Sequence, residues 1–152
     1  MPPSTVDHPA PRIEPSDRRI RVVFGAETIV DTRRAVRVVE GAHPPVYYVA
    51  LADVAPGALA PSDGRTTVCP WKGTASYFDV VVRGKRAERA AWTYPEPRPG
   101  VEALADAVAF YAAPMDACYV DDERVEPQSG GFYGGWITSD WEGNDAPRQQ
   151  LT

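Results

Sequence analysis

The sequence predicts a compact all-β domain, mainly antiparallel, with at most one or two short helices. Two observations lead to this fold class. Runs rich in β-branched and aromatic residues recur at about 8–12-residue spacing, and turn-forming residues separate them. Sixteen prolines and twelve glycines among 152 residues also favour short elements broken by turns over long helices.

The chain is expected to divide into a leader, one domain and a tail. Residues 1–17 are rich in proline and small polar residues, which is typical of a flexible leader. Residues 18–143 form the single β domain, and residues 144–152 form a loose C-terminal tail. A chain of this length can bury about 70% of the surface that its unfolded form exposes, so its core needs neither disulfides nor metal.

The first half of the domain predicts four strands. Residues 20–24 and 28–31 are rich in β-branched side chains, and residues 35–39 continue that pattern. Residues 41–45 contain two prolines, which cannot donate to a β-ladder and therefore end the third strand. The fourth strand covers residues 46–50.

A long hairpin is the clearest local feature. Residues 75–82 and 87–94 both read as strands, and Arg-Gly-Lys at 83–85 forms the turn between them. Before the hairpin, residues 51–64 form an irregular connection and residues 66–69 form a short strand.

The last third of the domain predicts weaker elements. Residues 101–107 are the one plausible short helix. Short strands at 109–111, 118–120 and 123–125 suggest a closing meander, and residues 128–152 are irregular.

The hairpin also predicts an aromatic wall. In a strand, alternate side chains face opposite sides, so Tyr77 points away from the apolar stripe that contains Val80 and Val82. Pairing of the two strands then brings Tyr77 beside Trp92 or Tyr94. Aromatic side chains at half-buried strand positions belong more often to a core than to a ligand platform, and this alternative stays open for Trp92.

The bend at residues 69–73 combines three reactive or permissive residues. Lys72 supplies a compact positive charge for a phosphate or carboxylate, and Gly73 lets the backbone approach a ligand closely. A nearby cation also lowers the pKa of a thiol such as that of Cys69. In the alternative interpretation Lys72 is solvated and Cys69, like Cys118, is an ordinary thiol.

Several classes of function are disfavoured. The formal net charge of −5 repels phosphate backbones, which disfavours nucleic-acid binding. No apolar run approaches the ~20 residues that span a bilayer, and no secretory signal is visible, so the expected location is cytoplasmic. Two cysteines cannot form a structural tetrathiolate zinc site, and phosphate-binding or dinucleotide-binding glycine motifs are absent, so neither metal nor cofactor is expected.

Histidine-dependent catalysis has one candidate. His8 lies in the leader, which leaves His43 as the base that a Cys69–His43 dyad would need. A histidine beside two prolines is usually a plain loop residue.

Four segments together resemble a known bacterial family. They are residues 41–48, 69–77, 91–97 and 132–136, within a likeness that covers about residues 19–143. The family is called domain of unknown function 427. The resemblance implies a β-tent fold like that of the Mss4-like proteins. Many relatives of that fold hold zinc with CxxC pairs, which this chain lacks. The resemblance therefore implies the fold without the metal.

Some members of that family carry a nucleotidyltransferase label. Asp140 and Glu142 follow Gly134-Gly135 too closely for a turn, a helix and a strand to lie between them. The two acids are therefore interpreted as surface residues, and the label gains no support from the sequence.

The main functional hypothesis is an aromatic-walled pocket for a small molecule that carries a phosphate or carboxylate. Lys72 would bind the anionic group, Tyr77 would donate a hydrogen bond or act as a general acid, and Cys69 is a candidate nucleophile. The ligand-binding candidates are Tyr48, Trp71, Trp92, Tyr94 and Trp136. Whether the protein is an enzyme stays open.

Two alternatives accompany this hypothesis. One is a noncatalytic interaction module that acts as a homodimer through exposed aromatic side chains. The other is a redox or thiol role for Cys69.

Overall fold

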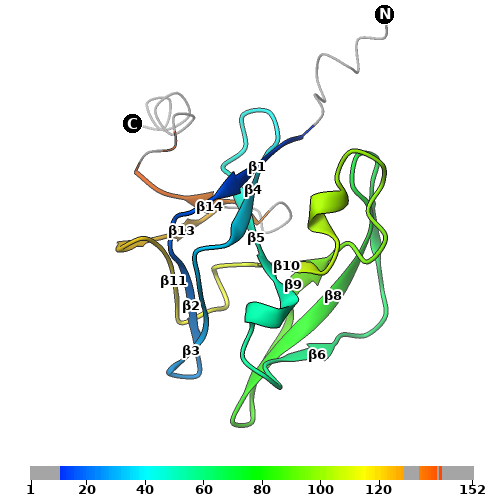
Figure 1. Cartoon of the computed structure of the whole chain (residues 1–152). Coiled ribbons are helices and arrows are strands. Elements are labelled where there is room, and N and C mark those ends of the chain that lie inside the picture. Colours follow the sequence, from blue (N-terminus) through cyan, green and yellow to red (C-terminus); the bar gives the residue numbers. More distant parts are fainter. Residues whose placement is uncertain (1–10, 129–133, 140, 142–152) are drawn as a thin grey trace, which may run out of the picture.

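The computed structural model describes residues 11–128, 134–139 and 141. The predicted all-β, antiparallel class is confirmed: the strands form one large sheet, a four-stranded sheet and a two-stranded ribbon (Figure 1). The expectations for residues 1–10, for the tail at 144–152 and for Asp140 and Glu142 fall outside the described residues.

The large sheet has the order β1-β4-β5-β10-β9-β8-β6, and β7 also pairs with β8. Its strands are β1 (Arg12–Ser16), β4 (Ala35–Val39), β5 (Val46–Ala50), β6 (Leu59–Pro61), β7 (Thr67–Cys69), β8 (Gly73–Val82), β9 (Lys85–Thr93) and β10 (Ala107–Phe110). Segments that are far apart in the sequence therefore meet at its centre, where β10 lies between β5 and β9.

The second sheet has the order β12-β11-β2-β3. The remaining strands are β2 (Ile20–Phe24), β3 (Glu27–Thr32), β11 (Ala117–Val120), β12 (Glu123–Arg124), and the ribbon strands β13 (Glu126–Pro127) and β14 (Trp136–Ile137). The described helical elements are two single 3₁₀ turns, η1 (Leu51–Asp53) and η2 (Glu102–Leu104).

The predicted long hairpin is confirmed as β8 and β9. Val82 pairs with Lys85, so the turn is the two residues Arg83 and Gly84, and both have positive φ, 50° and 82°. This backbone matches the right-handed twist of the flanking strands. The register places Tyr77 opposite Trp92, which is one of the two partners expected from the sequence.

One feature of this hairpin escapes simple alternation. The pairing shifts between Phe78 and Val80, and Arg89 on the partner strand has a φ of 50°. The Asp79 carboxylate accepts a hydrogen bond of 2.9 Å from the Arg89 backbone N–H at this bulge. Asp79 is therefore buried, although it lies on the face that the sequence marks as the more polar one.

The predicted leader extends too far into the domain. Residues Arg12–Ser16 form β1, which pairs along its whole length with β4. Pro15 pairs opposite Val36, and β1 is the edge of the sheet, where proline is tolerated. The prolines that suggested flexibility are therefore compatible with this strand.

Three predictions for the connections were also wrong in part. The helix expected at 101–107 is the single turn η2, and Ala107 already begins β10. The expected meander forms only in its second half, where β11 pairs with β12, because β10 joins the large sheet and β11 takes β2 as its other neighbour. Residues 51–64, expected to be irregular, contain η1 and β6. Local apolar patterns identify strands but do not choose their partners.

The core lies between the two sheets, so the opposite face of the large sheet is not part of this core. Tyr47 and Ala91 belong to a cluster that also contains Ile20 and Val22 of the second sheet. Their immediate neighbours Tyr48 and Trp92 belong to a separate cluster. Since successive strand residues face opposite sides, this second cluster covers the outer face of the large sheet.

Candidate functional site

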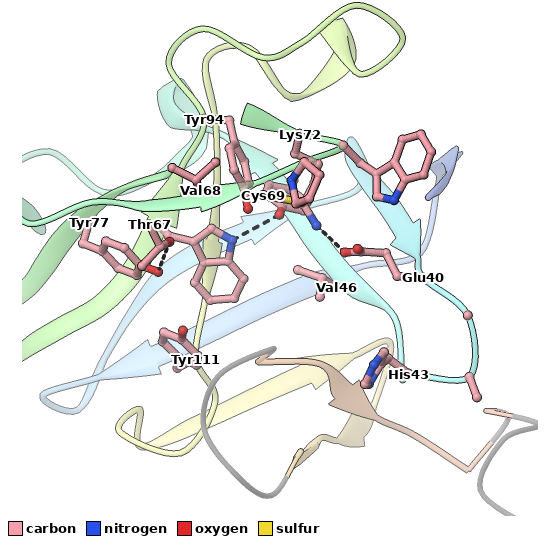
Figure 2. A pocket seen from close by; sticks show the side chains of 16 residues that line it. Glu40, His43, Val46, Thr67, Val68, Cys69, Lys72, Tyr77, Tyr94 and Tyr111 are labelled. Carbon is pink, nitrogen blue, oxygen red and sulfur yellow. Dashed lines mark hydrogen bonds and ion pairs between the residues drawn. The ribbon is translucent and has the colours of Figure 1, made fainter. Parts of the chain in front are cut away.

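A hollow of about 600 Å³ opens on this outer face. Its walls come from the loop that follows β4, from β5, β7, β8 and β9, and from the bend after β7. Figure 2 shows the side chains of Lys72 and Glu40 at one end, Tyr77 and Thr67 at the other, and Tyr111 and His43 along the lower side.

The predicted site residues other than Trp136 meet in this hollow. They are Tyr48, Cys69, Trp71, Lys72, Tyr77, Trp92 and Tyr94. The sequence alone does not require this meeting, because the contributing strands are separated in the chain and only the β8–β9 hairpin is local. Their roles in binding or catalysis stay predictions.

Trp136 is part of the core instead. Its side chain is 1% exposed, and its indole N–H donates to the Phe110 carbonyl at 2.9 Å. Its ring lies against that of Tyr47, 5.7 Å between centroids. Unlike Tyr48 and Trp92, Trp136 does not line the hollow, so the predicted stacking role does not fit its position.

The aromatic wall is built around Trp92. Its indole N–H donates a 3.1 Å hydrogen bond to the Tyr48 hydroxyl, and the two rings meet edge to face at 86°. Tyr111 contacts Trp92 with 4.5 Å between centroids, and Tyr94 lies beside Tyr48 at 6.5 Å. Buried rings that fix each other in this way form a preorganised surface.

Lys72 is buried rather than solvated, and it already has a counter-ion. Its side chain is 8% exposed, and its ammonium forms an ion pair with the Glu40 carboxylate, which is 25% exposed. The ammonium also lies 5.6 Å from the centre of the Tyr94 ring. The structure therefore places a paired charge, not a free cation, at this end of the hollow.

Gly73 serves the backbone rather than a ligand. Its φ is 115°, and a Cβ atom at this position would lie 3.2 Å from the Glu96 carbonyl oxygen. The next turn of the chain is held nearby, because the Arg98 N–H donates to the Lys72 carbonyl at 3.0 Å. Close approach of two backbone segments, not of a ligand, explains this glycine.

Tyr77 is held on two sides. Its hydroxyl shares a 2.9 Å hydrogen bond with the Thr67 hydroxyl. The Arg89 guanidinium stacks over its ring at 3.9 Å, and Arg89 in turn donates to Asp63 at 3.0 Å. These contacts fix the ring at the edge of the hollow.

The two cysteines differ in environment. Cys69 is partly exposed and lines the hollow, whereas Cys118 lies in the core. Burial raises the pKa of the Cys118 thiol to about 12, which keeps it protonated and unreactive. His43 also lines the hollow, and its Nδ1 lies 3.0 Å from the Gln128 side-chain nitrogen.

Burial keeps the phenols of the wall protonated. Desolvation raises the pKa of Tyr48 and that of Tyr94, and it raises the pKa of Tyr111 to about 12. At neutral pH these hydroxyls therefore supply hydrogen-bond donors and acceptors but no negative charge.

Some lining residues were not predicted from the sequence. Among them are Glu40, Thr67 and Tyr111. Glu40 directly precedes the conspicuous segment 41–48, and Tyr111 directly follows β10. The positions of Glu40 and Tyr111 in the chain were therefore a signal that could have marked them as site residues. Their contacts, however, depend on pairing between distant strands.

Comparison with known proteins identifies the family. A family model described as "Domain of unknown function (DUF427)" matches residues 12–121. This chain belongs to that family. No curated protein matches the sequence.

The DUF427 match contains the site. Its range covers the hollow-lining residues from Glu40 to Tyr111, including Cys69, Lys72 and Trp92. Three of the four segments that carry the resemblance lie inside it, and residues 132–136 lie beyond it.

Within the described residues, no helix is long and apolar enough to cross a membrane. In the same part of the chain, no group of three or more His, Cys, Asp or Glu side chains could hold a metal ion.

Proposed function

We propose that this protein binds a small planar organic molecule in the hollow on the outer face of its large sheet. One observation carries the proposal: Lys72, Tyr77 and Trp92 line the same cavity of about 600 Å³. That volume lies within the roughly 300–1,000 Å³ range of sites for small ligands.

The composition of the walls supports the same conclusion. Six of the sixteen described lining residues are tyrosine or tryptophan, and a small number of polar groups lie among them, which is the usual make-up of a ligand site. Trp92 and Tyr48 are ordered by their own hydrogen bond, so little side-chain entropy would be lost when a ligand binds.

The charge of the ligand and any catalysis are finer predictions. An anionic group on Lys72, as expected from the sequence, would have to share the ammonium with Glu40. Roles for Tyr77 as a general acid and for Cys69 as a nucleophile stay hypotheses, as do a cytoplasmic location and the absence of nucleic-acid partners.

Native mass spectrometry of freshly purified protein tests the proposal. We expect a co-purified small molecule, or binding of planar compounds from a fragment library. Ala42→Trp places a large side chain on an exposed lining position and should abolish binding, whereas Ala52→Trp, exposed but away from the hollow, should not. Binding that is unaffected by Ala42→Trp, or no binding of any compound, would contradict the proposal.

A second candidate function is the noncatalytic homodimer. Val68 is 74% exposed and Trp71 is 39% exposed, and both lie at the rim of the hollow. Exposed large apolar side chains of this kind suit a partner surface. Light scattering over a range of concentrations tests it: a dimer that Trp71→Ser disrupts would support this function, and a strict monomer would exclude it.

A further inference from the structure

We infer that the ligand of this hollow is uncharged at its polar end and presents a hydrogen-bond acceptor beside a donor, as a carboxamide or lactam does. The inference rests on the proposed function and adds the chemical class of the ligand. Its basis is the pairing of Lys72 with Glu40 at one end of the aromatic wall (Figure 2).

The pair offers one group of each kind. The Lys72 ammonium has three N–H donors, of which Glu40 occupies one direction. The Glu40 carboxylate has two oxygens and can accept several hydrogen bonds. A carbonyl oxygen and a neighbouring N–H on the same ligand edge could therefore bind Lys72 and Glu40 together without separating the ion pair.

The sum of the charges disfavours an ion. Among the described lining residues, Glu40 and Lys72 are the ones with a full formal charge at neutral pH, and they cancel. A carboxylate brought to Lys72 would meet Glu40, and an ammonium brought to Glu40 would meet Lys72. Removing an ion from water costs free energy, and the Lys72–Glu40 pair, whose charges already cancel, does not attract the ion strongly enough to offset that cost.

His43 adds no charge to this count. The Gln128 side-chain oxygen accepts from the Gly135 N–H at 3.0 Å, so the Gln128 nitrogen is the atom that faces His43 Nδ1. An amide nitrogen donates, and Nδ1 must then be the acceptor, which is the form of a neutral imidazole. A protonated ring would set two donors against each other.

The rest of the cavity selects a flat molecule. The rings of Tyr48, Trp92 and Tyr94 form continuous apolar surface beside the ion pair, and Tyr111 extends it. Stacking and edge contacts with these rings favour an aromatic or conjugated ring over a flexible chain.

Three probes of nearly identical shape separate the alternatives: benzamide, benzoate and benzamidine, which are neutral, anionic and cationic at pH 7. The readout is the indole N–H signals in NMR spectra of ¹⁵N-labelled protein. Trp71 and Trp92 line the hollow, and Trp136 in the core is an internal reference. We expect benzamide to bind the natural protein about tenfold more tightly than either ion, a factor that corresponds to ~1.4 kcal/mol.

Variants that change the charge of the pair provide the control. Glu40→Gln leaves one net positive charge and should shift the preference toward benzoate. Lys72→Gln leaves one net negative charge and should shift it toward benzamidine. The double variant with both substitutions restores neutrality and should restore the preference for benzamide. If Glu40→Gln fails to fold, Lys72→Gln and the double variant still decide the question.

The outcomes distinguish this inference from the proposed function. If benzoate binds the natural protein most tightly and moves the Trp92 signal, the hollow is a ligand site but the inference is overturned. If none of the three probes moves the Trp71 or Trp92 signals at saturating concentration, the inference is overturned, and the fragment-library screen then decides the proposed function separately.

Discussion

The indole N–H of Trp92 donates its hydrogen bond to the hydroxyl of Tyr48, a residue 44 positions earlier in the chain. Strand β10 lies between the strands that carry them, and its Ala109 pairs with Trp92. Because alanine is small, the two large rings can meet across the intervening strand. This hydrogen bond thus joins β5 to β9 across β10 at the floor of the hollow.

Tyr48→Phe should destabilise the protein by about 1–3 kcal/mol, because the buried Trp92 N–H loses its acceptor. The measurement is urea denaturation, together with the position of the Trp92 indole signal in NMR spectra. Tyr119→Phe changes a half-buried tyrosine whose hydroxyl accepts from no indole of the described residues, and as the matched control it should change stability much less. Equal losses in the two variants would contradict the structural role of this bond.

Gly134→Ala should destabilise the protein, because the added methyl group would collide with Trp92 and Tyr111 in the wall of the hollow. A Cβ atom there would lie 2.6 Å from Trp92 Cη2 and 2.9 Å from Tyr111, and the φ is 70°. Gly57 has a similar φ of 81° but no neighbour within 4 Å, so Gly57→Ala measures the backbone cost alone. We expect Gly134→Ala to lose about 1–3 kcal/mol more than Gly57→Ala, measured by chemical denaturation.

Sequence reasoning was strongest where one short segment determines the structure. The glycine-containing turn and the apolar alternation of β8 identify the hairpin from one short segment, although the register shift between Phe78 and Val80 decides that Tyr77 pairs with Trp92. Prediction from the sequence failed where a side chain finds its contact partner in a distant segment of the chain. Lys72 was expected to be available to a ligand, because Glu40, 32 positions away, shows no local relation to it.

The same limit explains two errors of position. Tryptophan is a residue type that often binds ligands, but the indole N–H of Trp136 donates to the Phe110 carbonyl in the core. Pro15 suggested a flexible leader, but the edge position of β1 accommodates it. In both cases burial and strand order decide the role, and neither can be read from residue type.

The two thiols should differ in reactivity. In native protein a disulfide reagent such as DTNB should modify about one thiol, Cys69, because Cys118 is 2% exposed and burial raises its pKa to about 12. In denaturant the count should rise to about two. Cys69→Ser should abolish the native reaction, and rapid modification of Cys118 in the folded variant would contradict its placement in the core.

Asp79 should make the stability of the β8–β9 bulge depend on pH. Its pKa is lowered chiefly by the hydrogen bond from the Arg89 N–H, with a further contribution from Arg86. A lowered pKa in the folded state means that the carboxylate stabilises the protein above its unfolded pKa, about 4, and that this contribution disappears as pH falls through the lowered value. Asp79→Asn should therefore cost about 1.5–3 kcal/mol at pH 7, the range for hydrogen bonds to charged groups.

The difference between Asp79→Asn and the natural protein should shrink as the pH falls below about 4, because protonation then removes the same charge from the natural protein. Urea denaturation at a series of pH values measures it. Asp122→Asn is the control, since that side chain is fully exposed and should show little effect at any pH. A cost for Asp79→Asn that stays constant down to the acid limit would mean that packing of the side chain, rather than its charge, holds the bulge in place.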